Sequence, residues 1–471
     1  MQQQRPRVTV PPFVEEICRA IKQAGFNCYV VGGALRDQIL GRAPVPDEWD
    51  IATSARPDDV MKIFPRCVPT GIAHGTVTVL LDDHKAEVTT FRQEGGYTDA
   101  RHPDSVKFLG SIEEDLARRD FTINAMAYDP LAGHFVDPYG GMEDLKSRLV
   151  KTVGDPAVRF GEDGLRPLRG ARFVAVLGFR LERATFEAME GVLQSFLMVS
   201  AERKRDEIIK MMKAEKPSLG WEILRKARYI KGIFPEMVKM VGAPGGELHK
   251  YDVWNHSIMA CDFCPGAWQV RLAALLHDIG KPFVEADQPE SEVEASYDED
   301  GEPAQETRKT FYRHQQAGSE IVQRWMERMR FSNEDIRLVA RLIEHHMVLY
   351  SPEWSDAAVR RFIGRVGEDL LDDLFTLVES DIKARGTAQE ALSLLNELKS
   401  RARGEMKKEV ALAIKDLAVG GLDIMKQLSL DPGPLIGRIL RGLLDRVIED
   451  PSLNRRETLL RLAGEIKEKE Q

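Results

Sequence analysis

Two carboxylates stand one residue apart in the segment PDEWDIAT (46–53) near the N-terminus. On an extended strand, Glu48 and Asp50 would point to the same side, because successive side chains alternate between the two faces. Paired carboxylates repel each other unless a cation lies between them, and Mg²⁺ accepts such ligands while it leaves room for substrate phosphates. A solvated acidic turn could contain the same residues. The neighbouring motifs must therefore decide whether the pair forms a metal site.

A glycine pair precedes the carboxylates in VVGGALRDQILGR (30–42). Gly32 and Gly33 follow a short apolar strand and open a predicted helix, where backbone N–H groups can approach a phosphate. Arg36 lies on that helix. Transfer of a phosphoryl or nucleotidyl group requires a phosphate cradle of this kind, with carboxylates that hold a divalent metal beside it.

Two later segments combine arginines with acids, EEDLARRDFTINAMAYD (113–129) and RFGEDGLRPLRGARF (159–173). The forked donors of arginine suit phosphate oxygens. On a helix, Glu162, Asp163 and Arg166 would lie within one turn, so that Asp163 and Arg166 form an i,i+3 pair. A plain intrahelical salt bridge is the alternative interpretation of that pair.

The order of these motifs resembles the head of class II tRNA nucleotidyltransferases and bacterial poly(A) polymerases, which belong to the polymerase β superfamily. The resemblance includes TGIAHGTVTV (70–79), AEVTTFR (86–92) and the loop segment 91–108, and it covers about residues 27–235. It implies that Glu48 and Asp50 hold catalytic Mg²⁺ and that Glu87 supplies a third carboxylate. The family usually has Asp where this chain has Glu48, and Asp47 is a partial substitute.

The resemblance also implies a site for the incoming nucleotide. Its residues in this chain are Gly32, Gly33, Arg36, Arg118, Arg119, Asp120, Asn124, Glu162, Asp163, Arg166, Arg169 and Arg172. In the family the EDxxR motif reads the base without a template. Asp163 would accept from the exocyclic amine of C or A, and Arg166 would donate to the adjacent ring nitrogen. U and G present a carbonyl in place of the amine, and such a mismatch costs on the order of 1–3 kcal/mol.

A second group of candidate ligands follows in the C-terminal half. His256, the adjacent pair His277 and Asp278, and the distant Asp381 lie on successive predicted helices, and imidazole with carboxylate suits a divalent transition metal. This order resembles the HD phosphohydrolase superfamily, which implies a metal-activated water and hydrolysis of phosphate esters such as RNA ends. Further candidate metal ligands are His314, His345 and His346.

The periodicity predicts an α+β chain, because strands and helices mix up to about residue 150 and helical period dominates afterwards. We expect a mixed-sheet nucleotidyltransferase head at 1–150, followed by an all-α neck for base selection and RNA binding at 151–240. An HD body at 241–390, with an acidic insert at 284–308, and a helical tRNA-binding tail at 391–471 complete the chain.

Composition is compatible with a cytoplasmic protein. The net charge of −9 argues weakly against nucleic-acid binding, because basic runs such as 203–205 can form a local surface. Five cysteines make no disulfide framework. The sequence has no apolar run long enough for a membrane span and no apolar core of a signal peptide near residue 1.

The resemblances predict an enzyme that adds C, C and A stepwise to the 3′ end of tRNA from CTP and ATP, without a template and with release of pyrophosphate. An enzyme that adds only A, or a poly(A) polymerase, is a narrower alternative. The loop sequence YTDARHP (97–103) argues against addition of CC alone, and the HD module argues against a poly(A) polymerase. An HD phosphohydrolase with an inactive head, which Glu48 favours, is the third hypothesis. The oligomeric state stays open.

Overall fold

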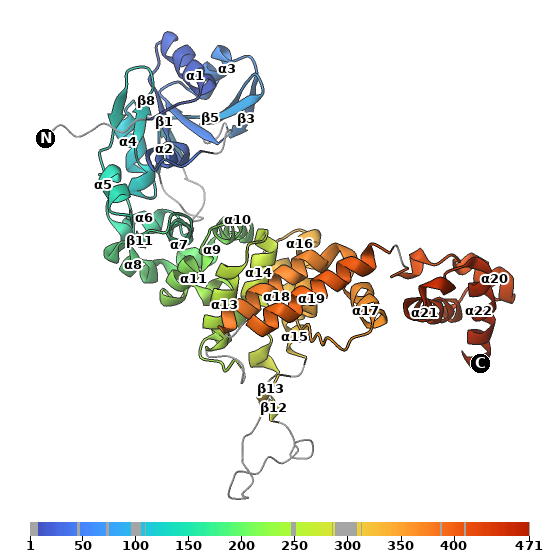
Figure 1. Ribbon diagram of the computed structural model, residues 1–471. Coiled ribbons are helices and arrows are strands. Elements are labelled where there is room, and N and C mark those ends of the chain that lie inside the picture. The colour runs from blue at the N-terminus through green and yellow to red at the C-terminus, as the bar shows by residue number, and fades with distance from the viewer. Residues whose placement is uncertain are drawn as a thin grey trace, which may run out of the picture. The chain divides into compact units, whose positions relative to one another are not determined.

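The chain folds into two compact units, Met1–Val238 and Lys239–Gln471 (Figure 1). The structure is a computed structural model. It describes residues 8–44, 48–71, 75–95, 105–108, 110–245, 251–284, 286–287, 309–311, 313–386, 389–408 and 411–470. The centre of the predicted acidic insert, the YTDARHP loop and Asp47 lie outside the described residues.

A seven-stranded mixed sheet forms the centre of the first unit, with the strand order β3-β4-β5-β2-β1-β8-β9. Its strands are β1 Cys28–Val31, β2 Trp49–Thr53, β3 Cys67–Gly71, β4 Thr76–Leu81, β5 His84–Thr90, β8 Ala127–Asp129 and β9 His134–Val136. Strands β2 and β5 are parallel, and the other neighbouring pairs are antiparallel. Asp82 and Asp83 lie at the turn of an antiparallel hairpin that β4 and β5 form.

Amphipathic helices cover the sheet. Helix α1 (Pro12–Gln23) buries Phe13, Val14, Ile17, Cys18 and Ile21 and ends two residues before Gly25. The other helices of this region are α2 Gly32–Ile39, α3 Pro57–Ile63, α4 Ile112–Ala117 and α5 Gly141–Lys146. Two short strands, β6 Arg92–Gly95 and β7 Ser105–Phe108, form a separate ladder.

The rest of the first unit is helical. It contains α6 Pro156–Glu162, α7 Arg166–Leu177, α8 Arg183–Met189, α9 Leu193–Met198, α10 Ala201–Met212, α11 Pro217–Lys226 and α12 Ile230–Ile233, with the strand pair β10 Leu149–Val150 and β11 Arg180–Leu181. Helix α7 packs against α10 and α11. These contacts place the arginines of α7 beside the polar side chains of α10.

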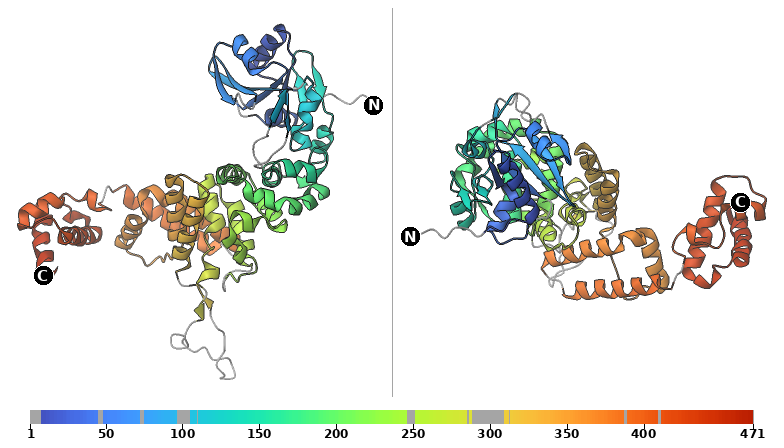
Figure 2. Two further views of the ribbon diagram at one scale, coloured as in Figure 1. Left: turned by 180° about the vertical axis from the view of Figure 1, so that it is seen from behind. Right: turned by 90° about the horizontal axis from the view of Figure 1, so that it is seen from above.

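The second unit is almost entirely helical. Its helices are α13 Val253–Phe263, α14 Trp268–Leu276, α15 His314–Arg328, α16 Asn333–His345, α17 Asp356–Val366, α18 Leu371–Arg385, α19 Gln389–Met406, α20 Gly421–Leu428, α21 Pro434–Glu449 and α22 Arg456–Glu470. The unit also contains a short pair of strands, β12 Ala286–Asp287 and β13 Lys309–Thr310. Helices α18 and α19 lie side by side (Figures 1 and 2). The α+β fold class of the chain is as predicted.

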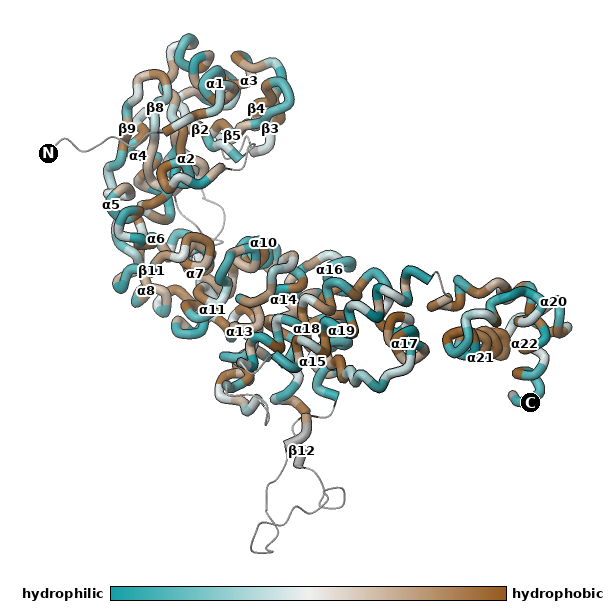
Figure 3. The backbone as a smooth tube through the Cα atoms, viewed as in Figure 1, coloured by the Kyte–Doolittle hydropathy of each residue, from teal (hydrophilic) through white to brown (hydrophobic). Residues whose placement is uncertain are grey.

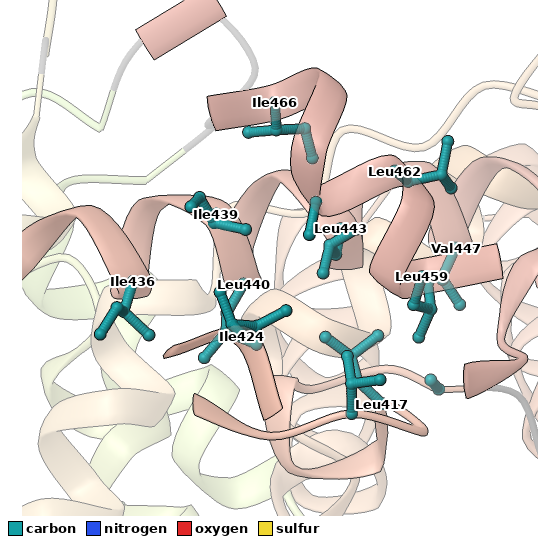
Figure 4. Packing of buried hydrophobic residues seen from close by; sticks show 13 residues of the cluster. Leu417, Ile424, Ile436, Ile439, Leu440, Leu443, Val447, Leu459, Leu462 and Ile466 are labelled. Atoms are coloured by element: carbon teal, nitrogen blue, oxygen red, sulfur yellow. The ribbon is translucent and has the colours of Figure 1, made fainter. Parts of the chain in front are cut away.

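Helices α20, α21 and α22 form a small core of their own near the C-terminus. Ile424 of α20, Leu443 and Val447 of α21, and Leu459 and Leu462 of α22 turn toward one another (Figure 4). Hydrophobic and hydrophilic residues alternate along the helices of both units, as expected for helices that bury one face (Figure 3). Among the described helices, none is both long and apolar enough to cross a membrane.

Candidate active site and metal centre

Strands β2 and β5 bring two carboxylates together. The two strands are parallel neighbours, and their register pairs Asp50 with Glu87, so both side chains project from the same face of the sheet. Glu48 lies two residues before Asp50, immediately ahead of β2, and is exposed. The three carboxylates that the sequence predicts as ligands therefore lie close together.

The electrostatics of this group fit a divalent cation. Burial raises the pKa of Asp50 to about 6; Arg119 opposes this effect, and the charges of Glu87 and Glu48 add to it. A cation between the carboxylates would relieve their repulsion. Carboxylate oxygens are also the ligands that Mg²⁺ prefers in proteins. The donor set of the head thus fits the predicted Mg²⁺.

The start of helix α2 lies against these carboxylates. Gly32 has a φ of +78°, and a Cβ atom at this position would lie 2.5 Å from Oδ2 of Asp50. Only glycine allows this conformation together with this close approach. The first N–H groups of a helix have no partner within the helix, and they carry its positive dipole end. The turn can therefore receive phosphate oxygens beside the carboxylates.

A chain of hydrogen bonds connects several of the predicted nucleotide residues. Nη1 of Arg36 donates to Oδ1 of Asn124 at 2.8 Å, and Nδ2 of Asn124 donates to Oδ1 of Asp120 at 3.4 Å. Oδ2 of Asp120 accepts from Nε of Arg169 at 2.7 Å. Although burial raises the pKa of Asp120, Arg169 and Arg166 hold it well below its usual value. Asp120 is therefore an ionised anchor for the arginine side chains.

Glu207 of α10 is a second anchor, which no pattern in the sequence predicted. Its buried carboxylate lies 3.3 Å from Nη1 of Arg169 and 3.0 Å from Nε of Arg172. Burial and the charge of Arg169 lower the pKa of Arg172 to about 10, so Arg172 remains a cation at neutral pH. Glu207 is separated from Arg169 by 38 positions, and no spacing rule connects residues that far apart.

Asp115 was not predicted either, although a sequence signal for it exists. The buried carboxylate lies 2.9 Å from Nη2 of Arg118 and 3.3 Å from Nη2 of Arg119. Asp115 precedes the two arginines by three and four positions, which is the spacing of neighbours on a helix face. Nη1 of Arg119 also donates to the carbonyl oxygen of Asn124 at 3.3 Å.

The predicted i,i+3 pair of Asp163 and Arg166 is wrong. Helix α6 ends at Glu162, Asp163 has an extended backbone, and α7 begins at Arg166. Arg166 contacts Glu162 at 2.6 Å, whereas Asp163 contacts Arg203 of α10 at 2.6 Å. The physical reason is Pro167, because proline is tolerated in the first turn of a helix but breaks its interior.

In the second unit, two helices, α13 and α18, and the turn after α14 bring the predicted HD residues together. His256 lies on α13, His277 and Asp278 follow α14, and Asp381 lies on α18. Nε2 of His256 is 2.9 Å from Oδ1 of Asp381 and 3.2 Å from Nε2 of His277. Nε2 of His277 is 3.3 Å from Oδ2 of Asp278. All four side chains are buried.

Two more histidines lie on the other side of Asp278. His314, the first residue of α15, and His346, which follows α16, have Nε2 atoms 3.3 Å and 3.8 Å from Oδ1 of Asp278. His345 is half-buried, and among the described residues it belongs to neither group of potential ligand atoms around Asp278. Of the two adjacent histidines that the sequence offered, only His346 joins the cluster.

Gly280 makes this arrangement sterically feasible. A Cβ atom at position 280 would lie 2.0 Å from the carbonyl oxygen of His314 and 2.7 Å from the backbone nitrogen of Gly318. The turn after Asp278 and the first turn of α15 are therefore in backbone contact. This contact brings the His314 ring to Asp278.

The cluster has the electrostatics of a cation site. Although burial lowers the pKa of His277, Asp278 and Asp381 raise it to about 10. Burial and the charge of His277 lower the pKa of His346 to about 3, so that ring is neutral. Imidazole and carboxylate donors in one buried group suit a divalent transition metal. The residues thus fit the metal that the sequence predicts.

Three domain families match this chain in order. Residues 28–151 match the poly A polymerase head domain, residues 178–240 match the probable RNA- and SrmB-binding site of polymerase A, and residues 257–413 match the HD domain. A CCA-adding enzyme from Streptococcus suis (strain 05ZYH33) is 31% identical over 457 residues, which cover 96% of both chains. The chain belongs to the CCA-adding enzyme family.

Other family members align over a shorter region. A CCA-adding enzyme from Lactobacillus helveticus is 47% identical over 195 residues, so that the chain spans about half of its length, 48%, in this match. The crystal structure of the Bacillus stearothermophilus CCA-adding enzyme in complex with CTP superposes with a TM-score of 0.72 at 26% identity, over 98% of this chain and 99% of that one. Family membership therefore extends to both units.

Proposed function

We propose that this chain adds C, C and A in turn to the 3′ end of tRNA, from CTP and ATP, without a template and with release of pyrophosphate. The observation that supports it most is the in-register pair of Asp50 and Glu87 beside the start of α2, in a chain of the CCA-adding family. The match of residues 178–240 to an RNA-binding region supports RNA as the acceptor.

In the proposed reaction, the 3′-oxygen of the RNA attacks the α-phosphorus of the nucleotide, and the bond to the pyrophosphate oxygen breaks. Mg²⁺ held by Glu48, Asp50 and Glu87 would neutralise phosphate charge and favour ionisation of the attacking hydroxyl. The N–H groups at Gly32 and Gly33 and the guanidinium groups of Arg36, Arg118 and Arg119 would hold the triphosphate. Their fixed hydrogen-bond partners, Asn124 and Asp115, keep Arg36, Arg118 and Arg119 preorganised for this role.

Base selection is proposed for Asp163 and Arg166, with support from α10. Oδ2 of Asp163 is held by Arg203, and its Oδ1 accepts from the backbone N–H of Leu165 at 3.0 Å. Arg166 is held by Glu162 and by the carbonyl oxygen of Arg118 at 3.0 Å. Both side chains therefore have a fixed direction from which to meet the amine and ring nitrogen of C or A. Arg169 and Arg172 extend this basic face.

Asp163→Ala is expected to relax the choice of base. Loss of one half-buried acceptor corresponds to about 1–3 kcal/mol, so the preference for CTP over UTP should fall about 10- to 100-fold. The measurement is kcat/KM for each nucleotide on a tRNA that ends before CCA. Asp206→Ala, at an exposed position of α10, is the matched control. An unchanged preference for CTP over UTP in the Asp163 variant would show that Asp163 does not take part in base selection.

Nucleotide incorporation tests the proposed activity directly. We would offer tRNA transcripts that end before CCA, after C and after CC, with each labelled nucleoside triphosphate and Mg²⁺. Ordered addition of C, C and A, followed by a stop, is expected. Addition of A to the CC-ended tRNA alone would indicate an A-adding enzyme, and a long A ladder would indicate a poly(A) polymerase. If no nucleotide is incorporated, the head is inactive as a nucleotidyltransferase.

The buried His–Asp cluster supports a second proposed activity in the HD body, metal-dependent hydrolysis of phosphate esters such as 2′,3′-cyclic or 2′-phosphate ends of RNA. A divalent metal held by His256, His277, Asp278 and Asp381 would activate water for this reaction. Chelation should abolish phosphate release, and added Co²⁺, Ni²⁺ or Mn²⁺ should restore it. If no divalent metal supports hydrolysis, the cluster is a structural element.

A further inference from the structure

An arginine directly after α2 has a fixed backbone. Gly41 follows the helix with a φ of +69°, and its N–H donates to the carbonyl oxygen of Gln38 at 3.0 Å. The N–H of Arg42 donates to the carbonyl oxygen of Asp37 at 2.8 Å. These two hydrogen bonds form the Schellman motif that ends many helices. The side chain of Arg42 is exposed, and it leaves the helix from a rigid position.

The guanidinium group of Arg42 contacts the C-terminal end of α7. Its Nη1 donates to the carbonyl oxygen of Val176 at 3.2 Å, and its Nη2 donates to that of Leu177 at 3.4 Å. Val176 and Leu177 are the last two residues of α7, and the carbonyl groups of a helix end have no partner within the helix. This end is also the negative pole of the helix dipole, which favours a cation. Arg42 therefore joins the C-terminal ends of α2 and α7, although it precedes Val176 by 134 positions.

A second contact joins the two helices nearer their middle. Cζ of Arg36, on α2, lies 5.3 Å from the centre of the Phe173 ring, on α7. Cζ of Arg172 lies 4.1 Å from the centre of the same buried ring. The face of an aromatic ring carries negative potential, so it stabilises both guanidinium groups although they repel each other. Helices α2 and α7 are thus joined by arginine side chains at two levels.

The opposite ends of the two helices carry different parts of the proposed nucleotide site. Helix α2 begins at Gly32, beside Asp50, where the triphosphate is proposed to bind. Helix α7 begins at Arg166, which is proposed to read the base. With 8 and 12 residues, the two helices are about 12 Å and 18 Å long and behave as rigid rods. A contact between their far ends therefore limits how the base-reading start can tilt relative to the triphosphate, and it uses no base-reading group.

We propose that Arg42 is a positioning residue that determines base specificity, because it fastens the far end of α7 to that of α2. The attachment holds Asp163 and Arg166 in one direction relative to the triphosphate. A base that pairs with both residues then has its α-phosphorus in line with the 3′-oxygen of the RNA, whereas a mismatched base does not. This inference rests on the proposed nucleotidyl transfer and adds a specificity-determining residue to it. Arg42 acts through α7 and not by contact with the nucleotide.

Arg42→Gln tests this role, because it removes the charge at an exposed position where the fold tolerates substitution. On tRNA that ends before CCA, kcat for CTP should fall about 10-fold, since a misplacement of about 1 Å can cost up to 10²-fold in rate. KM for CTP should stay within about twofold, because the triphosphate contacts remain. For UTP, whose base already fails to pair, kcat should not change. The preference for CTP over UTP should therefore also fall about 10-fold.

Two further variants separate positioning from a general loss of structure. Arg42→Lys keeps a cation that can donate to the carbonyl groups at the end of α7, and it should recover at least about half of the parent kcat for CTP. Arg183→Gln is the matched control, because it removes an exposed guanidinium group of α8 in the same unit, paired with Glu187 within that helix. Its kcat and its preference for CTP should stay within about twofold of the parent.

The outcomes distinguish this inference from the proposed activity. If the parent chain prefers CTP and Arg42→Gln keeps both kcat and that preference, the positioning role is overturned and the proposed transfer stands. Equal loss of kcat with CTP and UTP would also overturn it, because Arg42 would then support the site as a whole and not the choice of base. If the parent chain incorporates no nucleotide, the proposed transfer and this inference fail together.

Discussion

Asp50→Asn is expected to lower kcat/KM for CTP incorporation by about 10³-fold or more. The substitution keeps the size of the side chain but removes the most buried charge of the three carboxylates. Metal stabilisation of charge in the transition state amounts to several kcal/mol, and each 1.36 kcal/mol corresponds to a factor of ten. The measurement is incorporation of labelled CTP into tRNA that lacks its CCA end, with Mg²⁺ in excess.

Two controls separate this effect from misfolding. Asp58→Asn changes an exposed carboxylate of α3 in the same unit, and its activity should stay within about twofold of the parent. The metal content of the HD body should also be unchanged in Asp50→Asn. Activity of the Asp50→Asn variant within about tenfold of the parent would contradict the assignment of Asp50 as a metal ligand.

Arg360→Met is expected to loosen the C-terminal helices by about 3 kcal/mol, because the buried carboxylate of Glu405 then loses its buried partner and keeps only the more exposed Lys408. Nη1 of Arg360 donates to Glu405 of α19 at 2.7 Å, and its Nε donates to the carbonyl oxygen of Ile448 in the last turn of α21, also at 2.7 Å. The side chains of Arg360 and Glu405 are both buried. Hydrogen exchange of the amides in α21 and α22 should accelerate by about two to three orders of magnitude.

A second substitution distinguishes the unpaired charge from lost packing. Arg360→Met combined with Glu405→Met removes both charges, and it should restore most of the protection. Arg361→Met, which removes an exposed ion pair with Glu449, should change protection by less than about 1 kcal/mol. If the single and the double variants exchange equally fast, loss of the buried partner of Glu405 is not the cause.

Much of the fold follows from local sequence rules. The period of buried residues predicts α1, and Gly25 ends that helix because it has a φ of +89°. The pair Asp82 and Asp83 between two β-rich runs predicts the hairpin of β4 and β5. The helical character of residues after 155 is equally visible. These features depend on neighbours within one turn or one hairpin, which the sequence contains directly.

The chemistry-bearing residues of both sites were also predictable by type and order. A carboxylate pair after a Gly-Gly turn, and His-Asp followed by a distant Asp, restrict the chemistry to metal-assisted reactions of phosphates. Because residue type sets the ligand chemistry, the amino-acid sequence alone is enough to select Asp50 and Asp381 as candidates. Glu207, the buried anchor of Arg169 and Arg172, could not be selected with the same rules.

Tertiary structure decided which side chains meet. The sheet register places Glu87 beside Asp50. Packing of α10 on α7 brings Arg203 into contact with Asp163. From the sequence, Arg203 is expected to contribute to a basic surface. Helix ends mattered equally: α7 begins only at Arg166, just before Pro167, so Asp163 lies outside both α6 and α7.

The same holds for the histidines. His345 and His346 are indistinguishable by type, and only the end of α16 decides that His346 joins Asp278. The physical reason is that such contacts join residues tens of positions apart, and their geometry depends on how whole elements pack. Residue type and local spacing thus determined the chemistry available to this protein, whereas long-range packing decided which residues form each site.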